Sequence, residues 1–269
     1  EQPIIISGVD NLTDEVLDIS ADDISSIQDG FSRVQVGFLP GTASGVVNDI
    51  TIGDGSPLTL NDGFEFWTGG GIIEVASSLN LDAGGLAFIG REVNFQEDIE
   101  IRNTGTAFGL SIEPGARGQE ILIGSAVNNN DDNIVDITEA ELNVIQDGFA
   151  RLNIGRSVGF ANGAGNLRIP ASDTPLQIDR LQLRTAEGAV IIERDIENNG
   201  AFTIDAEVLQ FYADITINGG FTHNGPITII DDSSLNFARG ILLDNEITAV
   251  GDASFSLTSN NDVTLDGRI

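Results

Sequence analysis

Short apolar strand segments return every 20 residues along this chain, and this spacing constrains the fold more than any other feature. In the segment DITIN, Ile215 and Ile217 point to the same side, because alternate residues of a strand share a face. The alternation returns 20 residues later at Leu235 and Phe237. Further steps of this length lead from there to Phe255/Leu257, from Ile227/Ile229 to Ile247/Ala249, from Ile73/Val75 to Val93/Phe95, from Leu79/Leu81 to Ile99/Ile101 and from Ile101 to Ile121.

Two or three short strands in each period, separated by Gly, Asn and Asp turns, predict an all-β fold. The specific expectation is a parallel β-solenoid with coils of about 20 residues. A single coil cannot bury its apolar face, so coils stack and share one core. The alternative is a pair of β-sandwich domains. Sandwich strands follow one another every ~8–12 residues, but nothing holds them to a constant period.

A second repeat is much longer than the coil period. The segment VLDISADDISSIQDGFSRVQVG, Val16 to Gly37, returns 118 residues later as IVDITEAELNVIQDGFARLNIG, Ile134 to Gly155. We name these segments the first and the second cassette. The similarity continues at SPLTL against TPLQI and at FQEDIEI against FYADITI. The repeat predicts a first copy over residues 1–119, a second copy over 120–236 and continuing solenoid coils over 237–269.

Each cassette is expected to contain a short helix inserted into the solenoid at the IQDGF motif. Thr138 and Glu141 have capping-box spacing, and Ser20 with Asp23 form a weaker version of it. Apolar residues at i, i+3 and i+7 would share one helical face; in the second cassette they are Leu142, Ile145 and Phe149. Gly30 and Gly148 suit a left-handed helix end. We therefore expect a helix that covers a sheet.

The composition excludes several classes of partner and chemistry. The chain has 42 acidic residues against 12 basic ones, and its formal net charge is −30. Nucleic acid and anionic lipid both require a basic surface, so we expect neither as a partner. Cysteine is absent, which excludes disulfides and thiol nucleophiles. His223 is the only histidine, so the chain lacks the residues for zinc sites of the Cys/His type and for most catalytic triads that contain histidine.

The ends of the chain and its apolar runs bear on where it works. The sequence begins at Glu1 without a basic and apolar leader, so we expect a segment processed from a longer protein. No apolar run approaches the roughly 18 residues that would span a membrane. We therefore expect no membrane insertion.

One acidic loop has the ligand order of a calcium site. Oxygen-bearing side chains fall at positions 1, 3, 5, 9 and 12 of NNNDDNIVDITE, and these residues are Asn128, Asn130, Asp132, Asp136 and Glu139. The sixth position is Asn133 where such loops carry glycine, and the first cassette lacks two of the ligands. Ca²⁺ is thus the one cofactor that the sequence raises. A polar turn before a capped helix is the alternative interpretation.

The cassette and the coils that follow it, such as DITINGGFTHNGPITII, resemble repeats of filamentous-haemagglutinin-like bacterial exoproteins, including giant surface proteins of cyanobacteria. The resemblance covers nearly the whole chain and carries no catalytic residue. It implies a right-handed β-helix, secretion across a bacterial outer membrane and a location outside the cell or on its surface.

We therefore expect an extracellular structural protein and not an enzyme: a β-solenoid shaft or filament subunit that associates end to end with itself or with adjacent repeats. One alternative is a calcium-dependent adhesin domain that binds an extracellular glycan, for which Trp67 could stack on a sugar. Another is a β-helix polysaccharide lyase or hydrolase. Stacked Asp232 and Asp252 would then supply a carboxylate pair about 5 Å apart.

Overall fold

The computed structural model has an all-β fold in which short strands pair in parallel and stack into sheets. This confirms the parallel β-solenoid that the sequence predicts. Within the described residues, no helix is long and apolar enough to cross a membrane. The structure describes residues 3–7, 16–27, 30–37, 49–105, 108–126, 128, 133–146, 148–156, 164–185, 188–223, 225–239, 241–243, 246–260 and 263–265.

The chain divides into two compact units. Unit 1 consists of Glu1–Ala116 and Asn128–Ala150, and unit 2 of Arg117–Val127 and Arg151–Ile269. The repeat-based division into 1–119, 120–236 and 237–269 describes similarity of sequence, whereas these units describe packing. Most of the second cassette belongs to unit 1, because it packs there on strands of the first copy.

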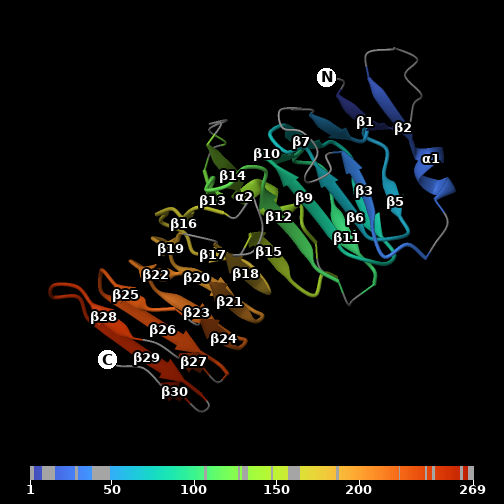
Figure 1. Ribbon diagram of the computed structural model, residues 1–269. Coiled ribbons are helices and arrows are strands. Elements are labelled where there is room, and N and C mark those ends of the chain that lie inside the picture. Colours follow the sequence, from blue (N-terminus) through green and yellow to red (C-terminus); the bar gives the residue numbers. More distant parts are fainter. Residues whose placement is uncertain are drawn as a thin grey trace. The chain divides into compact units, whose positions relative to one another are not determined.

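Unit 1 is built from three parallel sheets that the chain visits in turn (Figure 1). Their strand orders are β2-β1-β4-β7-β10, β5-β8-β11 and β3-β6-β9-β12. Helix α1 lies beside β2 and β5. The elements are β1 (Ile4–Ser7), β2 (Leu17–Ser20), α1 (Ala21–Ser26), β3 (Val34–Gly37), β4 (Ile50–Ile52), β5 (Leu58–Leu60), β6 (Phe64–Trp67), β7 (Ile72–Val75), β8 (Leu79–Leu81), β9 (Leu86–Gly90), β10 (Glu92–Phe95), β11 (Ile101–Asn103), β12 (Leu110–Pro114), β14 (Ile134–Thr138) and α2 (Glu139–Asn143).

Unit 2 repeats the same plan with more coils. Its strand orders are β13-β16-β19-β22-β25-β28, β17-β20-β23-β26-β29 and β15-β18-β21-β24-β27-β30. The strands are β13 (Glu120–Ser125), β15 (Leu152–Gly155), β16 (Leu167–Ile169), β17 (Leu176–Gln177), β18 (Leu181–Arg184), β19 (Ala189–Ile192), β20 (Ile196–Asn198), β21 (Phe202–Asp205), β22 (Val208–Phe211), β23 (Ile215–Ile217), β24 (Phe221–His223), β25 (Ile227–Ile229), β26 (Ser233–Phe237), β27 (Ile241–Leu243), β28 (Ile247–Ala249), β29 (Phe255–Ser259) and β30 (Val263–Leu265).

The predicted register of 20 residues is correct at several rungs. Three pairs of strand partners confirm it: Ile73 with Val93, Ile215 with Leu235, and Ile227 with Ile247. At these rungs one full coil of three strands and their turns is 20 residues long. Equal spacing in the sequence then becomes vertical stacking in the structure.

At other rungs the prediction is wrong. Leu79 pairs with Ile101 and not with Ile99, and Leu235 pairs with Leu257 and not with Phe255. Both steps span 22 residues, because the intervening turn is longer. A shift of two residues keeps every side chain on its predicted face, since strand side chains alternate with a period of two. The predicted step from Ile101 to Ile121 is also wrong, because Ile101 pairs with Ile145.

Apolar side chains from all three sheets of each unit fill its interior and stack from coil to coil. In unit 1, the Phe66 ring lies 5.8 Å from the Phe64 ring and 5.8 Å from the Phe88 ring, measured between centroids. In unit 2, Phe202 and Phe221 are separated by 5.8 Å. Aromatic pairs at these distances add to the free energy gained by burial.

Both predicted capping boxes are present. Ser20 Oγ accepts a hydrogen bond from Asp23 N at 3.1 Å, and the Asp23 carboxylate accepts from Ser20 N at 2.9 Å. Thr138 and Glu141 exchange the equivalent bonds at 3.2 and 2.8 Å. These bonds satisfy main-chain N–H groups that a helix start leaves without an intrahelical partner.

The helices are nevertheless shorter than the sequence pattern predicts. They end at Ser26 and Asn143, before the IQDGF motifs. Beyond α2, Val144 O accepts from Ile101 N and Gln146 N donates to Ile101 O, both at 2.9 Å. Pairing with β11 requires an extended chain, so this tertiary contact ends the helix.

Candidate functional site

The second cassette lies on the outer edge of β10 and β11 in unit 1 and is held there by main-chain hydrogen bonds. Ile101 N donates to Val144 O at 2.9 Å, and Ile101 O accepts from Gln146 N at 2.9 Å. The two bonds form a parallel bridge between Ile101 and Ile145. The cassette therefore packs on the last coil of these sheets, joined to β11 by one bridge, while β14 lies against β10 without belonging to its sheet.

The IQDGF motif provides the close-packed part of this contact. Phe149 is 6% exposed, and Ala150 N donates to Phe108 O at 2.8 Å. Gly148 has a φ of +115°, and a Cβ at this residue would lie 1.9 Å from Asn103 O. Glycine is required here both by the positive φ and by the close approach of two main chains.

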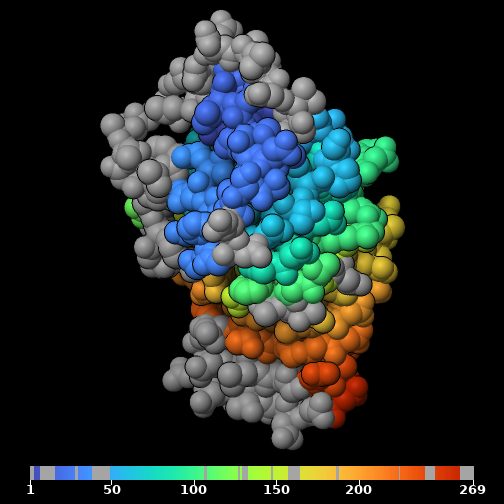
Figure 2. Space-filling model, turned by 90° about the vertical axis from the view of Figure 1, so that its right-hand side faces the viewer, coloured from blue at the N-terminus to red at the C-terminus, as the bar shows by residue number. Residues whose placement is uncertain are grey.

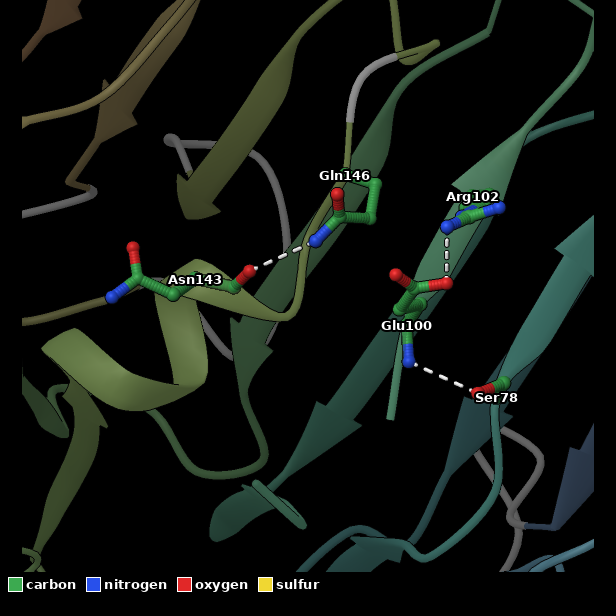
Figure 3. Close-up of polar contacts among 5 residues, drawn as sticks. All are labelled: Ser78, Glu100, Arg102, Asn143 and Gln146. Atoms are coloured by element: carbon green, nitrogen blue, oxygen red, sulfur yellow. Dashed lines mark hydrogen bonds and ion pairs between the residues drawn. The ribbon is translucent and has the colours of Figure 1, made fainter. Parts of the chain in front are cut away.

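Polar contacts flank the docked segment (Figure 3). Gln146 Nε2 donates to Asn143 O at 3.1 Å and satisfies a carbonyl at the end of α2. Before β11, Glu100 N donates to Ser78 Oγ at 3.0 Å, and the Glu100 carboxylate forms an ion pair with Arg102. About half of each charged side chain is exposed, so this ion pair contributes little to stability. The main-chain bonds and the buried apolar groups hold the cassette.

Three carboxyl side chains are buried where the second cassette meets β10. Glu92, Asp136 and Glu141 are 2%, 0% and 6% exposed. Glu141 Oε1 accepts from Phe95 N at 3.1 Å, and Glu92 Oε2 accepts from Asp136 N at 3.5 Å. Two of these carboxyl groups thus act as acceptors for main-chain N–H groups at a junction between coils.

Burial changes the ionisation of this cluster. It raises the pKa of Glu92 from the ordinary 4.5 to about 8, and it also raises the pKa of Glu141. The negative charge of Asp136 raises both pKa values further, while main-chain hydrogen bonds to each carboxylate oppose the change. Glu92 is therefore mostly protonated at neutral pH.

The predicted calcium ligands are spread over this region. Asn128 Nδ2 donates to Asn94 Oδ1 at 2.6 Å, Asp136 is buried on β14, and Glu139 is exposed in the first turn of α2. Asn130 and Asp132 lie outside the described residues. In the part of the chain that the structure describes, no group of three or more His, Cys, Asp or Glu side chains is placed to hold a metal ion. Calcium binding stays a prediction.

The first cassette has the same local structure but a different environment. Leu17 and Phe31 are 52% and 58% exposed, whereas the equivalent Val135 and Phe149 are 0% and 6% exposed. Strand β2 is the outermost strand of its sheet in the described part of unit 1. The first cassette, in blue in Figure 2, lies at the surface. It presents the surface that the second cassette buries.

Sequence reasoning missed Glu92 and the burial of Glu141. Glu141 was recognisable as a capping residue, but its carboxylate is buried only because it also reaches Phe95 N on β10. Glu92 begins an ordinary alternating strand, so nothing in its local pattern signals burial. Both residues are buried by the docking of a segment more than 40 residues away along the chain.

The other residues that the sequence singled out are buried or hydrogen-bonded within the solenoid. Trp67 is 7% exposed and part of the core of unit 1. Asp232 accepts hydrogen bonds from Ser254 N and Oγ, both at 2.8 Å, and these bonds lower the pKa of its carboxyl group. His223 is 1% exposed on β24, and burial lowers the pKa of its imidazole.

Unit 2 also contains a buried arginine that no sequence pattern singled out. Arg194 is 1% exposed. Its Nη1 donates to Gly124 O at 3.2 Å and its Nη2 to Thr174 Oγ1 at 3.0 Å. The guanidinium thus joins β13 to the segment that precedes β17, which is a structural role.

The chain matches no protein-family model, no curated protein sequence and no solved structure. The resemblance of the cassettes to filamentous-haemagglutinin-like repeats therefore stays a prediction, and any function must be argued from the geometry described above.

Proposed function

We propose that this protein is a structural β-solenoid, a subunit or shaft segment of an extracellular bacterial fibre, and that it associates end to end through its outermost coils. The observation that carries the proposal is the open edge of the sheets. Within the described residues, β2 is outermost in unit 1, and β28, β29 and β30 are outermost in unit 2. An outermost strand leaves main-chain N–H and C=O groups free to pair with another chain.

Of the side chains that commonly block such edges, β2 carries one, Asp18, whose carboxylate oxygens are inaccessible to solvent. Leu17 on β2 is 52% exposed, and Val250 next to β28 is 48% exposed. Neither strand contains Pro or Lys, the residues with which soluble proteins often prevent edge-to-edge pairing. The large negative charge keeps single molecules soluble and favours association when salt or divalent cations screen it.

Electron microscopy of the purified chain, with and without calcium, tests the proposal. We expect continuous filaments at high protein concentration. Filaments that form only with calcium would support working sites among Asn128–Glu139 and the stacked carboxylates. Single particles under every condition would contradict end-to-end association.

We further propose that the protein is not an enzyme. The register of β26 and β29 supports this, because Ser254 and not Asp252 lies against Asp232 and donates to its carboxylate at 2.8 Å, so the carboxylate pair of a glycosidase is not formed by these two residues. Incubation with acidic and neutral polysaccharides should release no reducing ends and no unsaturated sugars. Product release that disappears in Asp232→Asn would overturn this part of the proposal.

Location at the cell surface is supported by the resemblance of the cassettes alone. Surface biotinylation of intact cells that produce the chain should label it through introduced cysteines at exposed positions such as Ser256. Labelling only after cell lysis would contradict a surface location.

A further inference from the structure

The two cassettes show what the first cassette can bind. In unit 1, Val135 and Phe149 of the second cassette are 0% and 6% exposed, because β10 and β11 lie against that cassette. The equivalent Leu17 and Phe31 of the first cassette are 52% and 58% exposed. The same sequence motif is thus seen once with its covering coil and once without it. The covered copy serves as a template for the uncovered one.

The main chain of the first cassette also has an outward-pointing N–H group at Asp18. Leu17 N donates at 3.0 Å to O of Pro3, the residue before β1, so by strand alternation Asp18 N points to the outer side of β2. The equivalent N–H in the second cassette, that of Asp136, donates to the Glu92 carboxylate of the covering coil at 3.5 Å. Both carboxylate oxygens of Asp18 are inaccessible and have no hydrogen-bond partner among the described residues.

The last coil of unit 2 has the chemistry of the coil that covers the second cassette. Strand β10 ends the ladder Ile50–Ile73–Val93, and β28 ends the corresponding ladder Leu167–Val190–Leu209–Ile227–Ile247. Glu92 precedes Val93, and Glu246 precedes Ile247 in the same way. In the second sheet, Ile101 of β11 corresponds to Leu257 of β29, which ends the ladder through Ile215 and Leu235.

From these equivalences, we infer that the outer face of the first cassette, formed by β2, Leu17 and Phe31, is an interaction surface for the terminal coil β28–β29 of a second copy of this chain. The Glu246 carboxyl group of one molecule takes the place that Glu92 has on Asp136, and accepts from Asp18 N of the other. Leu257 packs where Ile101 packs. This inference rests on the proposed function and names the two surfaces that meet in it.

The charges of both surfaces predict how this contact responds to salt. Asp22 and Asp23 are exposed on α1, and Glu246 is exposed beside β28. These like charges repel when two copies approach, while the apolar and main-chain contacts attract. Association should therefore strengthen as ionic strength rises, which is the opposite of an interface held by ion pairs.

Sedimentation velocity over a range of concentrations tests the inference with matched variants. Leu17→Asp/Phe31→Asp alters the cassette face. Phe108→Asp/Tyr212→Asp is its control, because it places the same added charge at two other exposed aromatic residues, 43% and 37% exposed. The altered side chains are exposed in both double variants, so both should keep the far-ultraviolet circular dichroism of the unaltered chain.

A third variant alters the other surface. Val250 N donates to Ile229 O and Ile227 N to Glu246 O, so by alternation Ala249 N points away from β25. Ala249→Pro removes that outward donor at an edge strand, where proline is tolerated. Thr248→Ala is the control on the same strand, because the Thr248 main chain points toward β25.

The unaltered chain and both controls should associate as concentration rises. The double cassette variant and Ala249→Pro should each associate at least tenfold more weakly, since loss of central apolar contacts or of main-chain pairing costs about 1.4 kcal/mol or more. A mixture of these two variants should form dimers and nothing larger, because one intact surface of each kind remains.

Three results would overturn the inference. If the double cassette variant associates as strongly as its control while the unaltered chain forms filaments, another surface joins the molecules and the proposed function stands. If the mixture forms no dimers, β28–β29 is not the partner of the cassette. If the unaltered chain stays monomeric at every concentration and salt, both the inference and the end-to-end association of the proposed function are wrong.

Discussion

The two cassettes of unit 1 compare the same motif in two environments. Both contain a strand, a capped short helix and the IQDGF motif. In the second cassette, a coil lies against the outer edge of the motif and Phe149 is 6% exposed; in the first, Phe31 is 58% exposed. The motif therefore folds locally through its capping box, whereas the neighbouring coil decides whether its phenylalanine is buried.

Ionisation separates the two cassettes as clearly as burial does. Asp23 and Glu141 hold the same capping position and accept the same two hydrogen bonds. Hydrogen bonds from Ser20 lower the pKa of the exposed Asp23 carboxyl group, whereas burial raises the pKa of Glu141. One structural role thus gives opposite pKa changes when the solvent exposure differs.

The largest expected difference between the cassettes is in the free energy contributed by their phenylalanines. Phe149→Ala should lower the free energy of unfolding by about 3–5 kcal/mol, because it removes a buried ring and leaves a cavity. Phe31→Ala should change it by less than about 0.5 kcal/mol in dilute solution. Urea denaturation of both variants measures this. Equal losses would mean that the first cassette is also covered in the monomer.

The second prediction concerns the pH dependence of stability. Glu92 has a folded pKa of about 8 and an ordinary value of 4.5, so the folded state holds this proton more tightly than the unfolded state. The stabilisation is complete below about pH 4.5 and is lost as the pH rises toward about 8. Over that window the loss should be on the order of 5 kcal/mol, because each pKa unit corresponds to about 1.4 kcal/mol.

Glu92→Gln tests this pH dependence, because glutamine stays neutral. The variant should match the unaltered chain near pH 5 and exceed it in stability near pH 8, as followed by thermal unfolding. Glu74→Gln, on the exposed side of the neighbouring strand β7, serves as control and should leave the slope unchanged. His223 acts in the opposite direction: its lowered pKa makes the protein lose stability as the pH falls below about 6.5.

Alanine at the two equivalent glycines should destabilise the protein to different extents. Both residues have positive φ, +120° at Gly30 and +115° at Gly148, so alanine is strained at either position. A Cβ at Gly30 meets nothing within 4 Å, but a Cβ at Gly148 would collide with Asn103 O. Gly148→Ala should therefore cost about 2 kcal/mol more than Gly30→Ala. Equal melting temperatures would show that main-chain contact at Asn103 is dispensable.

The smallest expected difference is at the helix caps. Ser20→Ala and Thr138→Ala should each cost about 1 kcal/mol, because each removes one acceptor for a main-chain N–H. Both hydroxyls also donate to the carboxylate of their capping box at 2.8 Å, but Glu141 is buried and Asp23 is exposed, so Thr138→Ala should cost a few tenths of a kcal/mol more. Denaturation midpoints of the two variants, with Ser25→Ala in α1 as a further hydroxyl control, measure the difference.

The sequence predicted the fold class and much of the register from side-chain alternation. The rungs at Ile73/Val93 and Ile227/Ile247 follow from equal spacing, because turns of equal length stack equal strands. The rungs at Leu79/Ile101 and Leu235/Leu257 were missed by two residues, because turn length varies without altering the alternation. The capping boxes were predictable since their donors and acceptors lie three residues apart.

The carboxylate cluster could not have been predicted in the same way. Glu92 and Asp136 meet only because β14 lies against β10, and no local pattern records that approach. The two IQDGF motifs are identical in sequence, yet Phe31 is 58% exposed and Phe149 is 6% exposed. The solvent exposure of these side chains depends on whether a neighbouring coil covers them.

By itself, the sequence determined the parallel strands, the inserted helices with their caps and the charge of the protein, because these depend on alternation, on hydrogen bonds a few residues apart and on composition. Only the tertiary structure decided where each helix ends, which carboxyl groups have a raised pKa and which cassette has exposed apolar side chains. These outcomes depend on main-chain pairing and burial between segments far apart in the chain, whose free energies no local pattern contains.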